Sequence, residues 1–523
     1  MTITPLAWSA LAGPIALLAV ALLPAARPKA LAARARIAAV IGLITAALAA
    51  GAVALAGPFA SPALPGVSIL FDGLTAVMFL LVSFVGTIVV QFSRNYMAGD
   101  PGHARFTRLL SATLASVLLL ILSGNMAMFL AAWVATSLAL NQLLLFYSDR
   151  PAAILAARKK FIASRIGDLA LALAIGILWQ ASGTLEFAGM FAALKAQGAA
   201  SPALVLAGGL IALAALLKSA QFPLHGWITE VMETPTPVSA LLHAGIINAG
   251  GFLALRFAPL LELSTPAMDL LLVVGGFTAL FASVVMLTQN AIKVSLAWST
   301  IAQMGFMLLQ CGLGAWAAAL LHIVAHSLYK AHAFLSSGSV IDIARASWSP
   351  SPGGAPHPAR LAMAVALVLA AVGVAGTLSG FAIAVQPGVF ALGAILLMGL
   401  THYIAQSIDQ RPTGFVIART MVAAVAVAAG WFALQAGMAA LMAGTLPAEA
   451  ARTDAVALIA VAIIVAGFAA LTIGQASFIT AKGADTPAWA RAFYVHVQNG
   501  LYVNTLANRL VLALWPTGLP SRR

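Results

Sequence analysis

The segment KSAQFPLHGWITEVMETPTPVSALLHAGIINAGGFLALR, residues 218–256, decides the fold of this chain. It follows an apolar run over 203–217, and Pro223 comes shortly after the lysine with which it begins. Proline ends or kinks a helix, and helices broken at membrane depth are tolerated where they line a polar cavity. The segment therefore predicts a broken membrane helix beside a polar cavity, with Lys218 at the break.

The rest of the chain is strongly apolar. Of its 523 residues, 62% are hydrophobic and 8% are charged, and the mean hydropathy is +1.02. Long Ala/Leu-rich runs without period-two alternation favour membrane helices over barrel strands. We expect an all-α polytopic membrane protein with 14 or 15 transmembrane helices. The runs lie near 6–25, 35–57, 69–92, 107–123, 126–147, 160–181, 203–217, 236–257, 267–288, 294–313, 315–338, 361–384, 389–407, 418–440 and 455–479.

The net charge of +13 follows a membrane pattern. With the N-terminus outside, eighteen Lys and Arg side chains, Lys160 among them, lie in inward loops. Only Lys195, Arg256 and Arg452 lie in outward loops. This is the positive-inside distribution, and it explains most of the basic excess without a nucleic-acid partner. We expect a multi-pass inner-membrane protein with a retained first helix and a cytoplasmic C-terminus.

No soluble domain is expected. We divide the chain into N-terminal transmembrane helices (1–105), a conducting core (106–345), C-terminal transmembrane helices (346–480) and an amphipathic tail (481–523). The tail mixes aromatic, polar and apolar residues at roughly helical spacing, which fits a membrane-surface anchor and a partner-docking helix equally well. A weaker second break is expected at 376–380, where the sequence reads GTLSG.

Ionisable residues inside the spans are the functional signal, because each costs about 2.5–3.5 kcal/mol at the centre of a membrane helix. Lys218 is interpreted as buried, since the break and its polar neighbours argue against snorkelling to the surface. His322, His326 and Lys330 are spaced i, i+4, i+8 and share one helix face. Such a row is typical of a proton relay, and an internal polar packing seam is the alternative. His243, among small residues, is a weaker candidate, because a lone buried histidine is more often a packed core residue.

Further candidates are groups that modulate the charge of Lys218 and groups that offer an exit. The modulating groups are Arg165, Asp168, Glu230, Glu233 and Asp72, and the exit groups are His402 and Tyr403. For Arg165 and Asp168, at i, i+3, a local ion pair near the inner surface is the simpler interpretation.

Several chemistries are excluded by what the sequence lacks. It contains no Walker A, GxGxxG or GxSxG sequence, and Ile323 stands where an HExxH zinc motif needs glutamate. Cys311 is the only cysteine, which excludes disulfides and iron–sulfur clusters within the chain. We therefore expect an ion-translocating subunit, not an enzyme, with no cofactor or metal of its own, driven by an ion gradient or by a partner.

Two long segments, 218–256 and 290–341, resemble the signature of proton-antiporter-like membrane subunits, as does FDGL at 71–74. This superfamily includes the large antiporter-like subunits of respiratory complex I and Mrp-type Na⁺/H⁺ antiporter subunits. The resemblance covers roughly 65–345 and implies two inverted repeats of five helices, each with a broken helix, around a hydrophilic axis. It places the channel lysine of the family at Lys218. The relay histidines and the central lysine of the family fall on His243, His322, His326 and Lys330.

The sequence departs from that family at two positions. The family carries a glutamate directly after a tryptophan on its fifth helix, whereas Trp133 is followed here by Val134. The family also has a lysine in its second broken helix, and 361–384 contains none. The carboxylate partner of Lys218 is therefore missing or replaced by Asp168 or Glu230, and the exit half of the path is in doubt.

The segments 150–168 and 494–516 resemble the DabB family, the membrane subunits of two-component inorganic-carbon accumulation complexes. That resemblance implies a DabA-like partner similar to a zinc-dependent β-carbonic anhydrase, with the zinc in the partner. It also implies that H⁺ or Na⁺ flux through this chain, embedded in the lipid bilayer, drives hydration of CO₂ to bicarbonate there. The alternatives are an antiporter-like subunit of a respiratory, hydrogenase or Mrp complex, and a non-conducting scaffold that docks a soluble enzyme.

Overall fold

The computed structural model describes residues 8–24, 27–61, 66–198, 200–231, 234–338, 358–379, 387–399, 401, 405, 414–448, 452–480 and 487–515. The expected Glu233, His402 and Tyr403 lie outside these residues.

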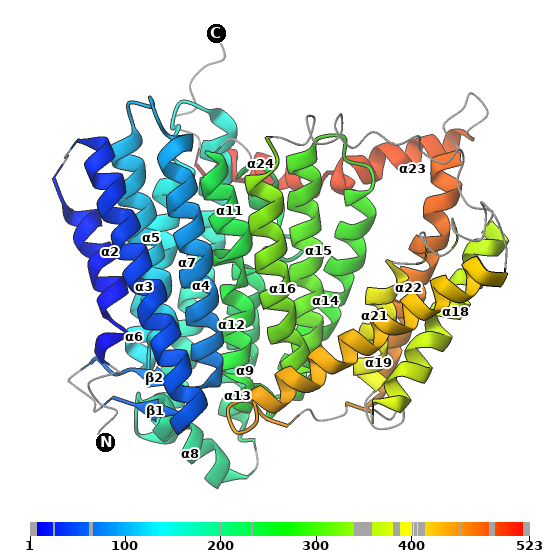
Figure 1. Ribbon diagram of the computed structural model, residues 1–523, viewed down its shortest axis with the longest axis horizontal. Coiled ribbons are helices and arrows are strands. Elements are labelled where there is room, and N and C mark those ends of the chain that lie inside the picture. Colours follow the sequence, from blue (N-terminus) through cyan, green and yellow to red (C-terminus); the bar gives the residue numbers. More distant parts are fainter. Residues whose placement is uncertain are drawn as a thin grey trace.

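Helices dominate the structure (Figure 1). The first group is α2 (Ala12–Leu22), α3 (Pro28–Ala56), α4 (Gly73–Tyr96), α5 (His103–Leu122), α6 (Met126–Leu144), α7 (Pro151–Ser182) and α8 (Phe187–Gln197). The second is α9 (Pro202–Lys218), α10 (Gly226–Thr229), α11 (Thr236–Ala244), η2 (Ile246–Asn248), α12 (Ala249–Arg256), α13 (Ala258–Leu261), α14 (Thr265–Met286), α15 (Ile292–Gly312) and α16 (Trp316–Leu335). The third is α18 (Pro358–Leu378), α19 (Pro387–Met398), α21 (Gly414–Leu441), α22 (Ala455–Thr480), α23 (Ala488–Gln498), η3 (Gly500–Tyr502) and α24 (Val503–Leu514). Two short strands, β1 (Phe59–Ala60) and β2 (Leu70–Phe71), pair antiparallel.

Each of the fifteen expected spans corresponds to a helix, but not every helix is a full span. In the described part of the chain, 11 helices are long and apolar enough to cross a membrane. The other four expected spans are α2, α9, α16 and α19. Of these, α2, α9 and α19 have 11, 17 and 12 residues. The fourth, α16, has 20 residues, and the histidines and lysine that it carries lower its hydropathy.

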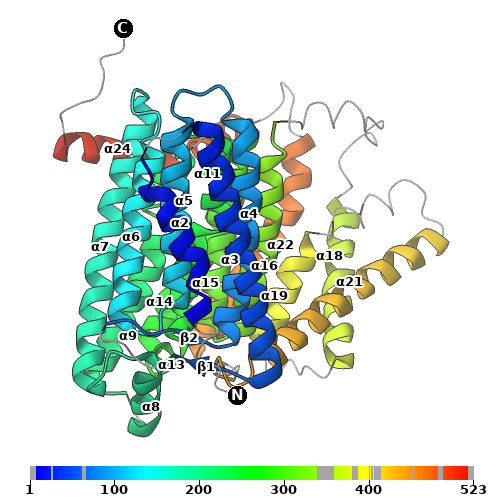
Figure 2. The same cartoon turned by 60° about the vertical axis from the view of Figure 1, so that its left-hand side comes forward.

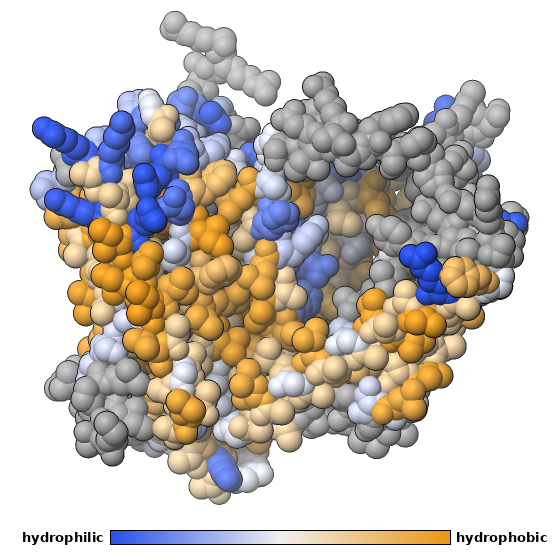
Figure 3. Space-filling model, viewed as in Figure 1, coloured by the Kyte–Doolittle hydropathy of each residue, from blue (hydrophilic) through white to orange (hydrophobic). Residues whose placement is uncertain are grey.

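The helices form an upright bundle with helices lying across one of its ends. In Figures 1 and 2, α2–α7, α9, α11, α12 and α14–α16 run roughly side by side, α8 and β1–β2 lie at the lower end, and α23 and α24 lie across the upper end. The helices α18, α19, α21 and α22 stand to one side, and α21 runs obliquely. Figure 3 shows a broad hydrophobic band on this face below a cap of hydrophilic residues, as a bilayer requires.

Small residues allow the core helices to approach closely. A Cβ added to Gly275 of α14 would lie 2.7 Å from the Gly305 carbonyl oxygen of α15, so the two backbones touch at this point. The lateral helices are tied to this core by Arg452, just before α22. Its guanidinium bonds Asp269 at 2.6 Å and the Gly312 carbonyl at 3.0 Å.

The expected break lies where the sequence placed it. α9 ends at Lys218, and a turn containing Ala220, with φ of 52°, leads to α10. An interruption of the predicted span 236–257 was not expected, but the structure breaks it between α11 and α12. Asn248 stabilises this interruption, because its side-chain amide donates to the Ala244 carbonyl at 3.1 Å and to Ser327 Oγ at 2.9 Å. Near the weaker expected break, α18 ends at Leu378.

Candidate functional site

Lys218 is buried at the end of α9 and does not snorkel. Its side chain is 9% exposed, and Nζ has no hydrogen-bond partner in the structure. The ammonium group instead lies 4.1 Å from the centroid of the Trp133 ring of α6. A cation over a desolvated indole face gains about 2 kcal/mol. The face of the Trp133 ring is therefore the direct contact of the ammonium group.

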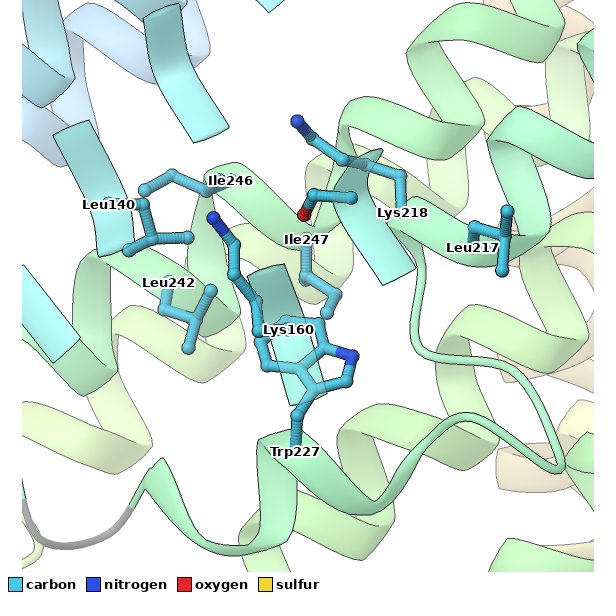
Figure 4. Close-up of a pocket in the computed structure, with 9 residues that line it drawn as sticks. Leu140, Lys160, Leu217, Lys218, Trp227, Leu242, Ile246 and Ile247 are labelled. Atoms are coloured by element: carbon cyan, nitrogen blue, oxygen red, sulfur yellow. The ribbon is translucent and has the colours of Figure 1, made fainter. Parts of the chain in front are cut away.

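A second lysine, Lys160 of α7, borders the same small cavity. It is 3% exposed and donates to Ser137 Oγ at 3.0 Å and to the Ser137 carbonyl oxygen. The cavity has a volume of about 10 Å³, which suits one particle of water size. Figure 4 shows Lys160 and Lys218 on two sides of this space, with Trp227 below. Two lysine side chains from different helices thus face one small cavity lined by buried residues.

The two carboxylates expected to serve Lys218 are bound to other cations. Glu230 forms an ion pair with Lys159 at 2.7 Å. Asp168 pairs with Arg165 at 2.6 Å, as its i, i+3 spacing predicted. Asp168 is close enough to attract Lys218 electrostatically, but it forms no hydrogen bond with it. In the structure, Lys218 therefore pairs directly with neither Glu230 nor Asp168.

His243 and Lys330 are joined through Thr300 of α15. His243 Nδ1 lies 2.9 Å from Thr300 Oγ1, which donates to the Leu296 carbonyl at 3.0 Å. Lys330 Nζ donates to the same carbonyl at 3.0 Å. Because the threonine proton is used on Leu296, Nδ1 of the histidine must donate, which leaves the Nε2 lone pair free. His243 stacks on Phe334 with ring centroids 4.3 Å apart.

His322 and His326 continue the row along α16, as the spacing predicted. Their ring centroids lie 6.1 Å apart, and His322 Nδ1 donates to Gln310 Oε1 at 3.0 Å. Neither ring nitrogen of His326 has a protein partner in the structure. With three titratable groups on one face and His243 close by, the arrangement can pass a proton in short steps.

Both of these histidines face a large open cavity. It has a volume of about 710 Å³, which gives room for many water molecules. Most of its polar side chains come from α14, α15 and α16, and the wall from α19, α21 and α22 is mostly apolar. Figure 3 shows a hollow with hydrophilic residues between the main bundle and the lateral helices. The polar lining residues include Ser299, Gln303, Gln310, His322 and His326.

Asp72 lies elsewhere, at the start of α4, and forms a structural ion pair. Its carboxylate accepts Arg256 Nη1 at 2.5 Å and caps α4 through the Thr75 backbone N–H at 2.8 Å. Arg256, treated above as an outward-loop charge, is 3% exposed. Removing either partner would leave an uncompensated buried charge.

At the same end of the bundle, Glu262 accepts the indole N–H of Trp316 at 2.8 Å and so holds the start of α16. Burial raises the pKa of this carboxyl, and the hydrogen bond partly offsets the effect.

The tail docks directly on Glu230. Asn504 and Asn508 of α24 donate to Glu230 Oε1 at 2.8 and 2.9 Å, and Lys159 also donates to Asn504 at 2.5 Å. The approach is close, since a Cβ added to Gly226 of α10 would lie 2.0 Å from Asn504 Oδ1. We call this group, Lys159, Glu230, Asn504 and Asn508, the tail latch. It connects α24 to the short helix that follows the break after Lys218.

Sequence reasoning missed Lys160 because it stands in a basic run that resembles a cytoplasmic flank. A usable signal was present: Lys160, Ser164 and Asp168 follow the same i, i+4, i+8 spacing as the α16 row. In the described part of the chain, no group of three or more His, Cys, Asp or Glu side chains is placed to hold a metal ion.

Comparison with known families agrees with this geometry. Residues 123–377 match the model of the transmembrane part of NADH:quinone oxidoreductase and Mrp antiporter subunits. Residues 65–107 match the model of the N-terminus of NADH-ubiquinone oxidoreductase (complex I) chain 5. The first match contains the break after Lys218, the buried lysines, and the segments that carry His243 and the His322–His326 pair.

Two solved structures share the fold. The Mrp complex from Dietzia sp. has a TM-score of 0.56 at 23% identity, over 99% of this chain and 56% of that chain. Respiratory complex I from Thermus thermophilus has a TM-score of 0.55 at 18% identity, over 97% and 99%. The all-α polytopic membrane fold of antiporter-like subunits is thereby confirmed.

Curated relatives define the family more narrowly. A probable inorganic carbon transporter subunit DabB2 of Halothiobacillus neapolitanus is 41% identical over 86% of this chain and 81% of its own length. The DabB of Hydrogenovibrio crunogenus is 47% identical, over about half of each chain (51% and 52%). NADH-quinone oxidoreductase subunit L of Mycobacterium tuberculosis is 40% identical over 52% and 43%. The chain therefore belongs to the DabB family of proton-antiporter-like membrane subunits.

Proposed function

We propose that this chain conducts protons, or Na⁺, across the inner membrane as the membrane subunit of an inorganic-carbon uptake complex. The observation that carries the proposal is the buried row from Lys160 and Lys218 through His243 and Lys330 to His326 and His322. A membrane helix retains such groups at a cost of a few kcal/mol each only when they work. The proposed assignment to an inorganic-carbon uptake complex rests on the family relationship, because the relatives are named as probable inorganic carbon transporter subunits.

In this mechanism the two halves of the row have different tasks. The lysines sit at a closed cavity, where a change in the charge of one ammonium group changes the free energy of charging the other. The histidines then pass the proton along α11 and α16 toward the open cavity, using the free Nε2 of His243 as an acceptor. His402 and Tyr403 remain the proposed exit groups.

The partner in this proposal is a DabA-like subunit with carbonic-anhydrase-like zinc chemistry. Hydration of CO₂ yields one bicarbonate and one proton, so a subunit that moves cations down their gradient can make the reaction one-way when the two are coupled. This chain contributes translocation and no covalent chemistry. With the buried Lys160 and Arg256 set aside, the distribution is 17 to 2 and still supports a cytoplasmic C-terminus. In this proposal the docked tail lies on the side of the partner.

The test is co-expression with the partner subunit in a carbonic-anhydrase-deficient host. We expect growth in air that an uncoupler abolishes and that Lys218→Met abolishes as well. Lys195→Met, at the exposed side of α8, is the matched control and keeps growth. Full rescue by Lys218→Met, or rescue insensitive to uncoupler, would contradict conduction and favour a docking scaffold.

A respiratory or Mrp-type subunit is the second candidate. The 40% identity to a NADH-quinone oxidoreductase subunit L favours it, although that match covers 52% of this chain. Co-purification of the native protein with flavin- or cluster-containing subunits would support it against the inorganic-carbon complex.

A further inference from the structure

The closed cavity beside Lys218 has an unusual lining. Its polar groups are the ammonium groups of Lys160 and Lys218, the hydroxyl of Ser164 and the indole of Trp227, and its other five lining residues are Leu or Ile. No carboxylate is among the nine. In the antiporter-like family a carboxylate is expected after the tryptophan, at the position of Val134.

The charges around this cavity do not balance. Among the ion pairs in the described residues, Glu230 binds Lys159 and Asp168 binds Arg165. Lys160 and Lys218 are left as two buried cations without a carboxylate of their own. Burying an ion costs several kcal/mol unless another charge compensates it. The contact of Lys218 with the Trp133 ring face offsets only about 2 kcal/mol of that cost.

Donors at the cavity are also left without partners, and the buried acceptors without a hydrogen bond on α6 and α7, Asn141 Oδ1 and the Asp168 carboxylate oxygens, do not line it. Lys218 Nζ and Trp227 Nε1 are buried without a partner, and their side chains are 9% and 4% exposed. Lys160 uses its bonds to Ser137 and has one further N–H available out of three. A water molecule would satisfy some of these donors but would neutralise no charge. An anion satisfies both requirements at once.

We propose that one small monatomic anion of the chloride class binds between Lys160 and Lys218 and replaces the missing carboxylate. The small volume, about 10 Å³, favours a single monatomic ion over the larger bicarbonate, sulfate or carboxylate. The inference rests on the proposed function in one respect: the anion holds the charge of Lys218, the group on which conduction depends. A dissociable counter-ion, unlike a fixed glutamate, makes that charge sensitive to halide concentration.

Equilibrium binding of radiolabelled chloride to the purified full-length chain, in a gluconate buffer, tests the site directly. We expect one saturable site per chain, with affinity reduced about tenfold or more by Lys160→Met or by Lys218→Met. Lys293→Met removes the same charge from α15, where the lysine bonds Thr236 at 3.1 Å, and should leave binding intact. Absence of saturable binding, or equal binding by Lys160→Met, would overturn the proposal.

A second variant tests replacement of the carboxylate. Ser137 Oγ lies 3.0 Å from Lys160 Nζ, so Ser137→Asp places a fixed negative charge beside the cavity. We expect this variant to lose chloride binding and its uptake to lose halide dependence, whereas neutral Ser137→Asn keeps both. If Ser137→Asp fails to fold, the comparison of Lys160→Met with Lys293→Met still decides.

The two proposals fail separately. Uptake that needs Lys218 but is unchanged when gluconate replaces chloride would overturn the anion site and leave conduction standing. Chloride binding that needs both lysines, combined with normal uptake by Lys218→Met, would overturn conduction and leave the anion site standing.

Discussion

Two regions accommodate buried charge in opposite ways. They are the cavity beside Lys160 and Lys218, which we call the lysine cavity, and the histidine row of His243, His326 and His322. At the first, two groups that are cationic in water face a small space of about 10 Å³ lined by buried side chains. At the second, imidazoles that can be neutral form a line that ends at an open space of about 710 Å³. Under the proposed function, this difference implies that one half of the path holds charge and the other passes it to water.

The largest effect should come from Lys330, the lysine of the histidine row. Lys330→Met removes the cation that shares the Leu296 carbonyl with Thr300 while keeping most of the side-chain volume. We expect a loss of cation-driven uptake of about 100-fold or more, because a positioned proton-transfer group typically contributes that much. Uptake by membrane vesicles that contain the assembled complex measures it, with protein amount determined in parallel. Near-normal uptake would contradict a proton relay and favour the alternative, in which these residues form an internal polar packing seam.

Accessibility should separate the closed region from the open one. Ser299→Cys, on the wall of the large cavity, and Ser164→Cys, at the lysine cavity, are matched substitutions in a Cys311→Ala background. A water-soluble thiol reagent should modify Ser299→Cys at least about tenfold faster, since reaction requires an exposed thiolate. Equal rates would mean that the two cavities do not differ in access to water.

Breaking the bridge of His243 should have an intermediate effect. Thr300→Val keeps the shape but removes the hydroxyl between His243 and Leu296, at a cost of about 1–3 kcal/mol for buried groups left without partners. We expect uptake to fall about tenfold. Thr113→Val is the control, because that hydroxyl bonds only the Leu109 carbonyl of its own helix at 2.8 Å. If both variants behave alike, the Thr300 bridge has no role in transfer.

The smallest effect on uptake should come from the tail latch. Asn504→Ala combined with Asn508→Ala removes two hydrogen bonds to a charged Glu230, each worth about 1.5–3 kcal/mol. We expect α24 to become more sensitive to protease and uptake by the complex to fall a few-fold. Asn499→Ala, whose amide bonds only the Val495 carbonyl, is the control. An unchanged protease pattern would show that the latch does not hold the tail.

Much of the site could be read from the sequence because helical spacing is local. The shared face of His322, His326 and Lys330 follows from a repeat of 3.6 residues per turn, and the helix end at Lys218 follows from the nearby proline. Which cation meets which carboxylate depends on contacts between helices, and sequence spacing does not contain them. Glu230 was thus expected to serve Lys218 but pairs with Lys159 and the tail.

By itself, the sequence determined that this chain is an all-α membrane protein with charges kept inside its helices, since composition and periodicity decide burial in a bilayer. It also determined that Val134 follows Trp133, where the family resemblance implies a carboxylate. Only the tertiary structure decided what stands in its place: Trp133 over Lys218, and Lys160 across the cavity. The physical reason is that a lysine in a basic run can be exposed or buried. Which of the two applies depends on whether neighbouring helices cover its side of the helix.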